Sequence, residues 1–153
     1  TFIGLHEAEN SYFHRAMCAQ DYSAVTAACL MTKASVFREV GGLTEELQVA
    51  FNDVDFCLKV RAAGYLVVYA PYAAMHNYES KSRGLEDTPE KVARFNREWS
   101  FVAERWPDIL KNGDPYYNPN LTLRKSNFAL RDLLKEKIGE PYQLPQLADQ
   151  EKQ

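Results

Sequence analysis

The stretch NDVDFCLKVRAAGYLVVYAP (Asn52–Pro71) decides the predicted fold, because it joins an acidic helix start to the clearest strand of the chain. Asn52 is expected to cap the helix, and Asp53 and Asp55 follow at the positive end of its dipole. A glycine ends the helix, and the β-favouring run Tyr65–Ala70 comes directly after it. This succession is typical of an α/β protein.

The residues before this stretch continue the same pattern. The small apolar run Tyr22–Thr32 predicts a buried strand, and Ser11–Cys18 a short helix. Ala34–Val40 reads as another short helix, stopped by the pair Gly41–Gly42. The first half therefore runs strand, helix, helix, strand, which supports the α/β class.

The second half is predicted to be more helical. Thr88 caps a helix that has a proline in its first turn and ends before Pro107. The segment Asp114–Leu121 is expected to be extended because of its two prolines, and a last helix is expected over Phe128–Ile138. Apolar residues at helical spacing form one stripe, predicted to be core packing: Val92, Phe95, Trp99, Val102 and Trp106.

Length and composition limit the function classes. The chain has 153 residues, with 18 Lys and Arg against 21 Asp and Glu, so the formal net charge is −3. That length suits one compact domain, and the charge excludes a generally basic nucleic-acid-binding surface. No apolar run approaches the roughly 20 residues of a membrane-spanning helix, and no signal segment is recognisable. Because the chain begins without Met, we expect it to be a piece of a longer protein.

The three cysteines indicate neither a zinc site nor a disulfide framework. Cys18, Cys29 and Cys57 are an odd number at irregular spacing. They are expected to be reduced and mostly buried, in a cytosolic protein.

The strongest candidate for chemistry is the acidic helix start. Side chains at i and i+2 of a helix cannot face the same way, so Asp53 and Asp55 should have separate roles. One could act as a base in a cleft while the other caps the helix or binds a basic side chain. Helix capping alone would also explain both residues.

Two further segments carry polar or aromatic side chains suited to ligands. Asp114–Asn120 holds tyrosines that could stack on a sugar ring, or could instead brace the last helix. The other segment follows the predicted strand, where α/β proteins commonly place working residues. Its possible metal ligands are His76, Asn77 and Glu79, and its possible phosphate contacts are Lys81, Ser82 and Arg83. A solvated loop is the alternative explanation.

Several blocks occur together in an order that resembles a known family. They are Ala24–Met31, Val36–Leu43, Phe51–Leu58, Gly64–Pro71, Glu79–Gly84 and Asp114–Leu121. In this order they resemble the C-terminal, acceptor-side half of a bacterial family 2 glycosyltransferase with the GT-A (Rossmann-like) fold, of the kind that builds surface polysaccharides. The resemblance covers roughly residues 22–123.

The resemblance implies an inverting mechanism with Asp53 as the general base. Asp53 would deprotonate the acceptor hydroxyl, which displaces the nucleoside diphosphate from the anomeric carbon of the donor sugar. The family usually has Glu before this Asp, where this chain has Asn52. Asn52, Asp55 and Thr26 are expected to bind the acceptor or support the base.

The resemblance also implies a divalent metal, Mn²⁺ or Mg²⁺, held mostly by an N-terminal half that this sequence does not contain. Lys81, Ser82 and Arg83 resemble the mobile segment that folds over the diphosphate. Relatives tend to carry a metal-reaching histidine at the position of Asn77, whereas this chain has His76 one residue earlier. Adjacent strand residues point to opposite faces, so His76 can take this role only if a local bulge turns it around. With that condition His76 is the candidate metal ligand, and Asn77 is the alternate.

From this resemblance we predict the domain organisation and the binding partners of the chain. Residues 1–87 form the acceptor-side α/β portion, residues 88–139 a helical extension, and residues 140–153 a poorly ordered tail. The expected partners are a nucleotide-sugar donor and a glycan or lipid-linked acceptor, with no nucleic acid. The fragment itself should be inactive and could self-associate through an exposed apolar face. The expected location is the cytoplasm, including the inner face of the cell membrane.

Two other functions are alternatives to the glycosyltransferase. A non-catalytic carbohydrate-binding or assembly module would keep the fold without the chemistry, and the Asn77 departure favours it. A metal-dependent hydrolase using Asp53 and Asp55 has little support, because no further ligands stand at suitable spacing.

Overall fold

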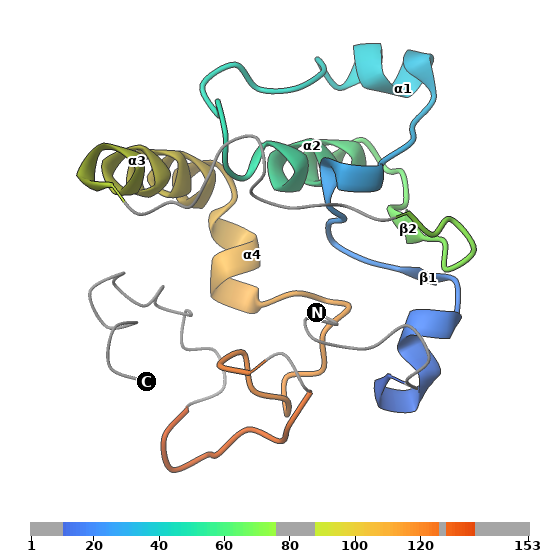
Figure 1. Cartoon of the computed structure of the whole chain (residues 1–153), viewed down its shortest axis with the longest axis vertical. Coiled ribbons are helices and arrows are strands. Elements are labelled where there is room, and N and C mark those ends of the chain that lie inside the picture. The colour runs from blue at the N-terminus through green and yellow to red at the C-terminus, as the bar shows by residue number, and fades with distance from the viewer. Residues whose placement is uncertain (1–10, 76–87, 126–127, 137–153) are drawn as a thin grey trace.

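A computed structural model shows that the chain is mostly helical, with one very small sheet at its edge (Figure 1). The structure describes residues 11–75, 88–125 and 128–136. The elements are η1 (Tyr12–Met17), β1 (Gln20–Asp21), η2 (Ala27–Cys29), α1 (Ala34–Glu39), α2 (Asn52–Ala62), β2 (Val68–Tyr69), α3 (Pro89–Arg105) and α4 (Pro107–Asn112). The predicted α/β class is therefore confirmed only as a mixture of helix and strand, with helix dominating.

The described sheet is one antiparallel pair. Gln20 pairs with Tyr69 and Asp21 pairs with Val68. One further bond extends the pairing, from the Tyr22 amide to the Val67 carbonyl at 2.9 Å. The strand predicted over Tyr65–Ala70 is thus present only at Val68–Tyr69.

The strand predicted over Tyr22–Thr32 is wrong. Ala27–Cys29 form the 3₁₀ turn η2 instead, after Thr26 accepts a hydrogen bond from the Ala28 amide at 3.3 Å. The apolar residues of this segment still pack inward, with Ala24 and Val25 against the buried core. Burial is also only partial, because residues 26–29 and Met31 are exposed while Ala24, Val25 and Leu30 are partly buried.

Helix α2 lies near the middle of the molecule, between α1, α3 and the sheet (Figure 1). It supplies Phe56, Cys57 and Val60 to the core, where they meet Val36 of α1 and Val67 next to β2. Gly64 follows the helix with φ of +88°, the left-handed conformation expected of a terminating glycine. The predicted C-terminal end of this helix is confirmed.

The predicted cap of α2 is wrong. Phe51 occupies the cap position in the left-handed conformation, with φ of +60° and no side-chain capping bond. Asn52 is the first helical residue, and its side-chain amide donates to the Leu47 carbonyl at 2.6 Å. The side chain therefore fixes the preceding loop rather than the helix end.

Helix α3 begins as predicted, since the Thr88 side chain accepts a hydrogen bond from the Lys91 amide and Pro89 is the first helical residue. The apolar stripe packs as predicted: the Phe51 ring lies 5.0 Å from the Phe95 ring and 5.6 Å from the Trp99 ring, centroid to centroid. Pro107 ends this helix but also begins α4, which the sequence reading missed. Proline at a first helical position costs no backbone hydrogen bond, so it starts a helix as readily as it stops one.

Two predictions for the C-terminal region are wrong. Residues 114–121 form successive turns rather than an extended segment, closed by bonds from Tyr117 to Asp114 and from Leu121 to Asn118. Over residues 128–136, where a helix was predicted, Leu130 forms an antiparallel bridge to Leu121 and the chain then turns at Asp132. The pairing with residues 120–122 takes the backbone groups that a helix would have used.

Several predicted features lie outside the described residues. They are the loop 79–87, the tail 140–153, and the candidate ligands His76, Asn77 and Glu79 with Lys81, Ser82 and Arg83. Among the helices that the structure describes, none has the length and apolar character needed to cross a membrane.

Candidate functional site

Asp53 lies in the first turn of α2, half-exposed, and is held by backbone groups. Its Oδ2 accepts a hydrogen bond from the Ala27 amide at 3.1 Å, and its Oδ1 accepts one from the Val54 amide at 2.9 Å. The Ala27 contact joins α2 to η2 at the surface. Within the described part of the chain, Asp53 forms no ion pair. Its carboxylate is thus oriented, open to solvent on one side, and free of a neutralising cation.

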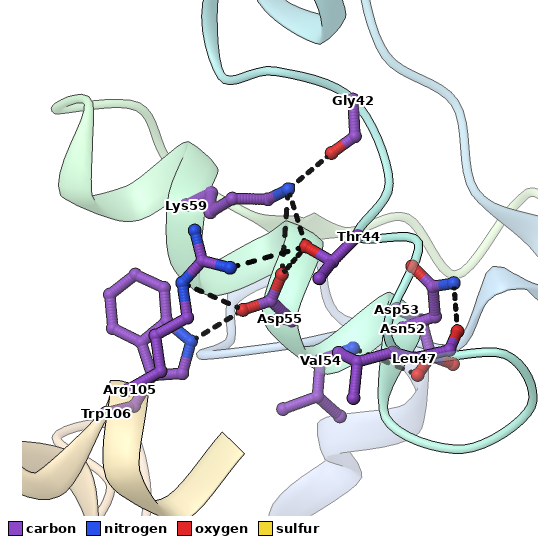
Figure 2. Close-up of polar contacts among 10 residues, drawn as sticks. All are labelled: Gly42, Thr44, Leu47, Asn52, Asp53, Val54, Asp55, Lys59, Arg105 and Trp106. Carbon is purple, nitrogen blue, oxygen red and sulfur yellow. Dashed lines mark hydrogen bonds and ion pairs between the residues drawn. The ribbon is translucent and has the colours of Figure 1, made fainter. Parts of the chain in front are cut away.

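Asp55, two residues later, is completely buried (Figure 2). Its Oδ2 accepts from the Thr44 hydroxyl at 2.5 Å, and its Oδ1 accepts from the Trp106 indole at 2.8 Å. Lys59 lies 3.6 Å away and Arg105 3.5 Å away, so two cations face this one carboxylate. Both oxygens are occupied, and the charge is compensated inside the protein.

Thr44 completes this buried cluster. Its hydroxyl oxygen accepts from Lys59 Nζ at 3.1 Å and lies 3.4 Å from Arg105 Nη1, while it donates to Asp55. Lys59 also donates to the Gly42 carbonyl at 2.5 Å. The cluster therefore connects α2, the loop after α1 and the corner between α3 and α4 (Figure 2).

Two other predicted site residues, Asn52 and Thr26, are near Asp53. One is its neighbour in the chain, and the other is next to a residue that binds it. Asn52 precedes it, and the Asn52 Oδ1 is buried without a hydrogen-bond partner in the described structure. Thr26 is exposed and immediately precedes Ala27, whose amide binds Asp53. Asp53, Asn52 and Thr26 are therefore brought together, while Asp55 belongs to the buried cluster.

The cysteines offer no activated nucleophile beside this site. Burial raises the pKa of the Cys57 thiol above its ordinary value of 9.0, and the nearby Asp53 charge acts in the same direction. Its sulfur lies 3.8 Å from the Val25 carbonyl oxygen. All three cysteines are free, as expected, but Cys18 and Cys29 are exposed, so the expectation of mostly buried thiols is wrong.

The tyrosine-bearing segment 114–120 is tied into the fold. The centroid of the Tyr116 ring lies 5.1 Å from the guanidinium carbon of Arg61. The backbone carbonyl of Tyr116 accepts a hydrogen bond from the Arg15 side chain at 3.3 Å. Asp114 Oδ1 accepts from the Ser23 hydroxyl at 2.7 Å, and Ser23 accepts from Arg61 at 2.8 Å. These contacts hold the segment 114–120 against Arg15, Ser23 and Arg61.

The described residues do not form a metal site. No group of three or more His, Cys, Asp or Glu side chains that could hold an ion occurs within residues 11–75, 88–125 and 128–136. The candidate ligands His76 and Asn77 lie outside these ranges.

Sequence reasoning missed most of the partners of Asp55. The only local signal was the spacing of Asp55 and Lys59, four residues apart on one helix. Thr44, Arg105 and Trp106 come from distant segments, and Trp106 was expected to be an apolar core residue. It is half-buried and its indole N–H serves the carboxylate, which no periodicity could indicate.

The chain is similar to short segments of much longer proteins. It is 56% identical over 120 residues to the protein named y4gI of Sinorhizobium fredii, covering 78% of this chain and 13% of that protein. It is 36% identical over 112 residues to the O-antigen biosynthesis protein RfbC of Myxococcus xanthus, covering 73% and 8% respectively.

A shorter match connects the chain to an enzyme. It is 30% identical over 81 residues to the N-acetylglucosaminyl-diphospho-decaprenol L-rhamnosyltransferase of Mycobacterium tuberculosis, covering 53% of this chain and 26% of the enzyme. No protein-family model and no solved structure matches the chain. The chain therefore shares partial similarity with glycosyltransferases of surface-polysaccharide biosynthesis, and it spans about a quarter or less of these relatives.

Proposed function

We propose that this chain forms the acceptor-side, base-bearing part of an inverting, metal-dependent glycosyltransferase in which Asp53 is the general base. The observation that carries the proposal is the unequal placement of two neighbouring carboxylates. Asp55 is completely buried, and both of its carboxylate oxygens accept hydrogen bonds from side chains. Asp53 is half-exposed, and its carboxylate accepts hydrogen bonds only from backbone amides. A base must reach its substrate, so Asp53 is the residue suited to the role.

The geometry supplies an oriented proton acceptor. An ionised carboxylate offers about four lone-pair positions, and the Ala27 and Val54 amides use two of them. Asp53 takes the proton from a bound acceptor hydroxyl while that oxygen bonds to the anomeric carbon of the donor sugar. The bond from this carbon to the nucleoside diphosphate breaks, and the diphosphate leaves with the electron pair.

The relatives support this choice of reaction class. One is named for transfer of rhamnose to a decaprenol-linked saccharide, and another for O-antigen biosynthesis. By analogy, the donor is a nucleotide sugar and the acceptor is a glycan or a lipid-linked saccharide. Such a reaction would place the protein on the cytoplasmic side of the cell membrane, where we propose that it acts as a peripheral protein.

The metal part of the proposal depends on residues outside the described ranges. An Mn²⁺ or Mg²⁺ ion would neutralise the leaving diphosphate. His76 or Asn77 would contribute a ligand, and Lys81, Ser82 and Arg83 would contact the diphosphate. In this proposal most of the ligands come from elsewhere in the polypeptide.

The test uses the polypeptide expressed from the complete gene. Asp53→Asn should lower sugar transfer by a factor of about 100 to 10,000, because the proton acceptor is removed while the shape is kept. Asp108→Asn is the matched control, since Asp108 is an exposed aspartate in the first turn of α4. Transfer is measured by nucleoside diphosphate release and product mass, with nucleotide sugars that include nucleotide-linked L-rhamnose, and with and without a chelator.

Full transfer by the Asp53→Asn variant would refute the assignment of the base. Undiminished transfer in the presence of the chelator would refute the metal dependence. If no donor is used but surface glycans still bind, the non-catalytic carbohydrate-binding module becomes the better description.

A further inference from the structure

A polar groove lies beside α3, and the ring of its Phe101 lies 5.9 Å from the guanidinium of Arg105, a member of the buried cluster. Its deeper part is a hollow of about 260 Å³ between α3 and the loop before α2, where Glu46 and Gln48 face Arg94, Arg97 and Phe101. A shallower hollow continues from Arg97 and Phe101 along α3 to Ser100. The groove therefore combines two structural segments that are far apart in the sequence.

Glu98 provides an unsatisfied acceptor at the wall of this groove. Its side chain is only 4% exposed, and its Oε2 accepts from the Ala50 amide at 2.6 Å. Its Oε1 accepts no hydrogen bond within the described structure, and the nearest cation is Arg94 at 3.8 Å. A buried carboxylate oxygen without a donor is costly, so this position favours a ligand that brings an O–H or N–H group.

The residues that line the groove indicate which class of ligand it can bind. Around the deeper hollow, Arg94 and Arg97 balance Glu46 and Glu98, so neither a strongly anionic nor a strongly cationic ligand is favoured. The lining offers both hydrogen-bond donors and acceptors, as a polyhydroxylated ligand requires. Phe101 adds an aromatic surface that can pack on the C–H face of a sugar ring.

The groove is connected to the segment that carries Asp53. Glu98 holds the Ala50 amide, Phe51 follows and packs on Phe95 and Trp99 of α3, and Asp53 comes two residues later. We propose that the groove is a saccharide subsite that binds sugar units of the acceptor glycan beyond the unit whose hydroxyl meets Asp53. This inference rests on the proposed function and adds an extended, oligomeric acceptor to it.

The test measures binding of oligosaccharides to the polypeptide of the complete gene. The probes are mono- and tetrasaccharides, fractionated by size after partial hydrolysis of the surface polysaccharide of the source strain. Arg97→Ala should weaken tetrasaccharide binding about tenfold, because an ionic hydrogen-bond donor is lost. Ser100→Trp should abolish it by filling the groove from an exposed position, and monosaccharide binding should change little. Calorimetry gives the affinities.

Arg38→Ala is the matched control, since Arg38 is an exposed arginine on α1. Unchanged tetrasaccharide affinity in both groove variants would overturn the proposal, as would the absence of saturable binding by the unmodified protein. The experiment distinguishes failure of the transferase proposal from failure of the groove proposal. Loss of binding in the variants, without sugar transfer by the unmodified protein, would refute only the transferase. Transfer whose acceptor KM is unaffected by either variant would refute only the groove.

Discussion

At the residue scale, two aspartates separated by one residue have opposite surroundings. Successive helical residues are rotated by about 100°, so Asp53 and Asp55 project in nearly opposite directions from α2. Asp53 reaches η2 and solvent, while Asp55 reaches the buried cluster of Thr44, Lys59 and Arg105. The spacing predicted that the roles would differ, and the buried contacts of Asp55 identify it as the residue that binds basic side chains.

Cys57 gives a prediction at the same scale. Its side chain is 1% exposed and burial raises its pKa, so both access and thiolate fraction oppose alkylation. Iodoacetamide at pH 8 should modify the exposed Cys18 and Cys29 quickly and Cys57 only after unfolding, as followed by peptide mass spectrometry. In denaturant all three should react at similar rates, and fast native labelling of Cys57 would contradict the structure.

The direction of the pKa shift also fixes a pH dependence. Because the pKa of Cys57 is raised in the folded state, folding favours the neutral thiol. The corresponding stability is complete below the ordinary value of 9.0 and is lost as the pH rises through the folded-state pKa.

At the element scale, the end of α1 depends on two glycines with different surroundings. Gly41 and Gly42 both have positive φ, at +78° and +66°. A Cβ at Gly41 would meet no atom within 4 Å, whereas one at Gly42 would lie 3.0 Å from the Phe37 ring. That ring packs against Phe56, with centroids 5.5 Å apart, so its freedom to move is limited.

The two glycines therefore form a matched pair for a stability measurement. Gly41→Ala should cost about 1 kcal/mol from backbone strain alone. Gly42→Ala should cost about 1–3 kcal/mol more, because the added methyl group also crowds the Phe37 ring. Urea unfolding of both variants measures the difference, and equal midpoints would show that the ring moves aside freely.

At the scale of the whole molecule, distant segments are joined by a few polar contacts that seal the apolar core. Trp106, at the corner between α3 and α4, binds Asp55 of α2. On another side of the molecule, Arg61 binds Ser23 and Ser23 binds Asp114, which fixes the turns after α4. These contacts hold the C-terminal helices and turns against the segment that carries Asp53.

Replacing Trp106 should loosen this arrangement measurably. Trp106→Phe keeps an aromatic ring but removes the indole donor, and should cost about 2 kcal/mol of unfolding free energy because a buried carboxylate loses a hydrogen bond. Trp99→Phe is the control, since Trp99 packs on Phe51. A double-mutant cycle with Asp55→Asn should give a coupling of about 1 kcal/mol for Trp106 and near zero for Trp99. Equal coupling for both would contradict the contact.

The sequence by itself determined the presence of α1, α2 and α3, but not of α4. The C-terminal ends of α1 and α2 follow from glycines with positive φ, and the start of α3 follows from Thr88 and Pro89; these signals act within one or two helical turns. It also identified Asp53 and Asp55 as a pair whose members differ. These features depend on interactions between near neighbours in the chain, which a sequence displays directly.

Only the tertiary structure decided which segments pair and which polar groups are buried. In the segment 22–32, Ala24, Val25 and Leu30 pack on the core without forming the predicted strand, and Leu130 bridges to Leu121 where a helix was predicted. The partners of Asp55 come from positions 44, 105 and 106. The physical reason is that strand pairing and burial of a charge depend on groups that are distant in the sequence, and local propensity contains no information about which groups those are.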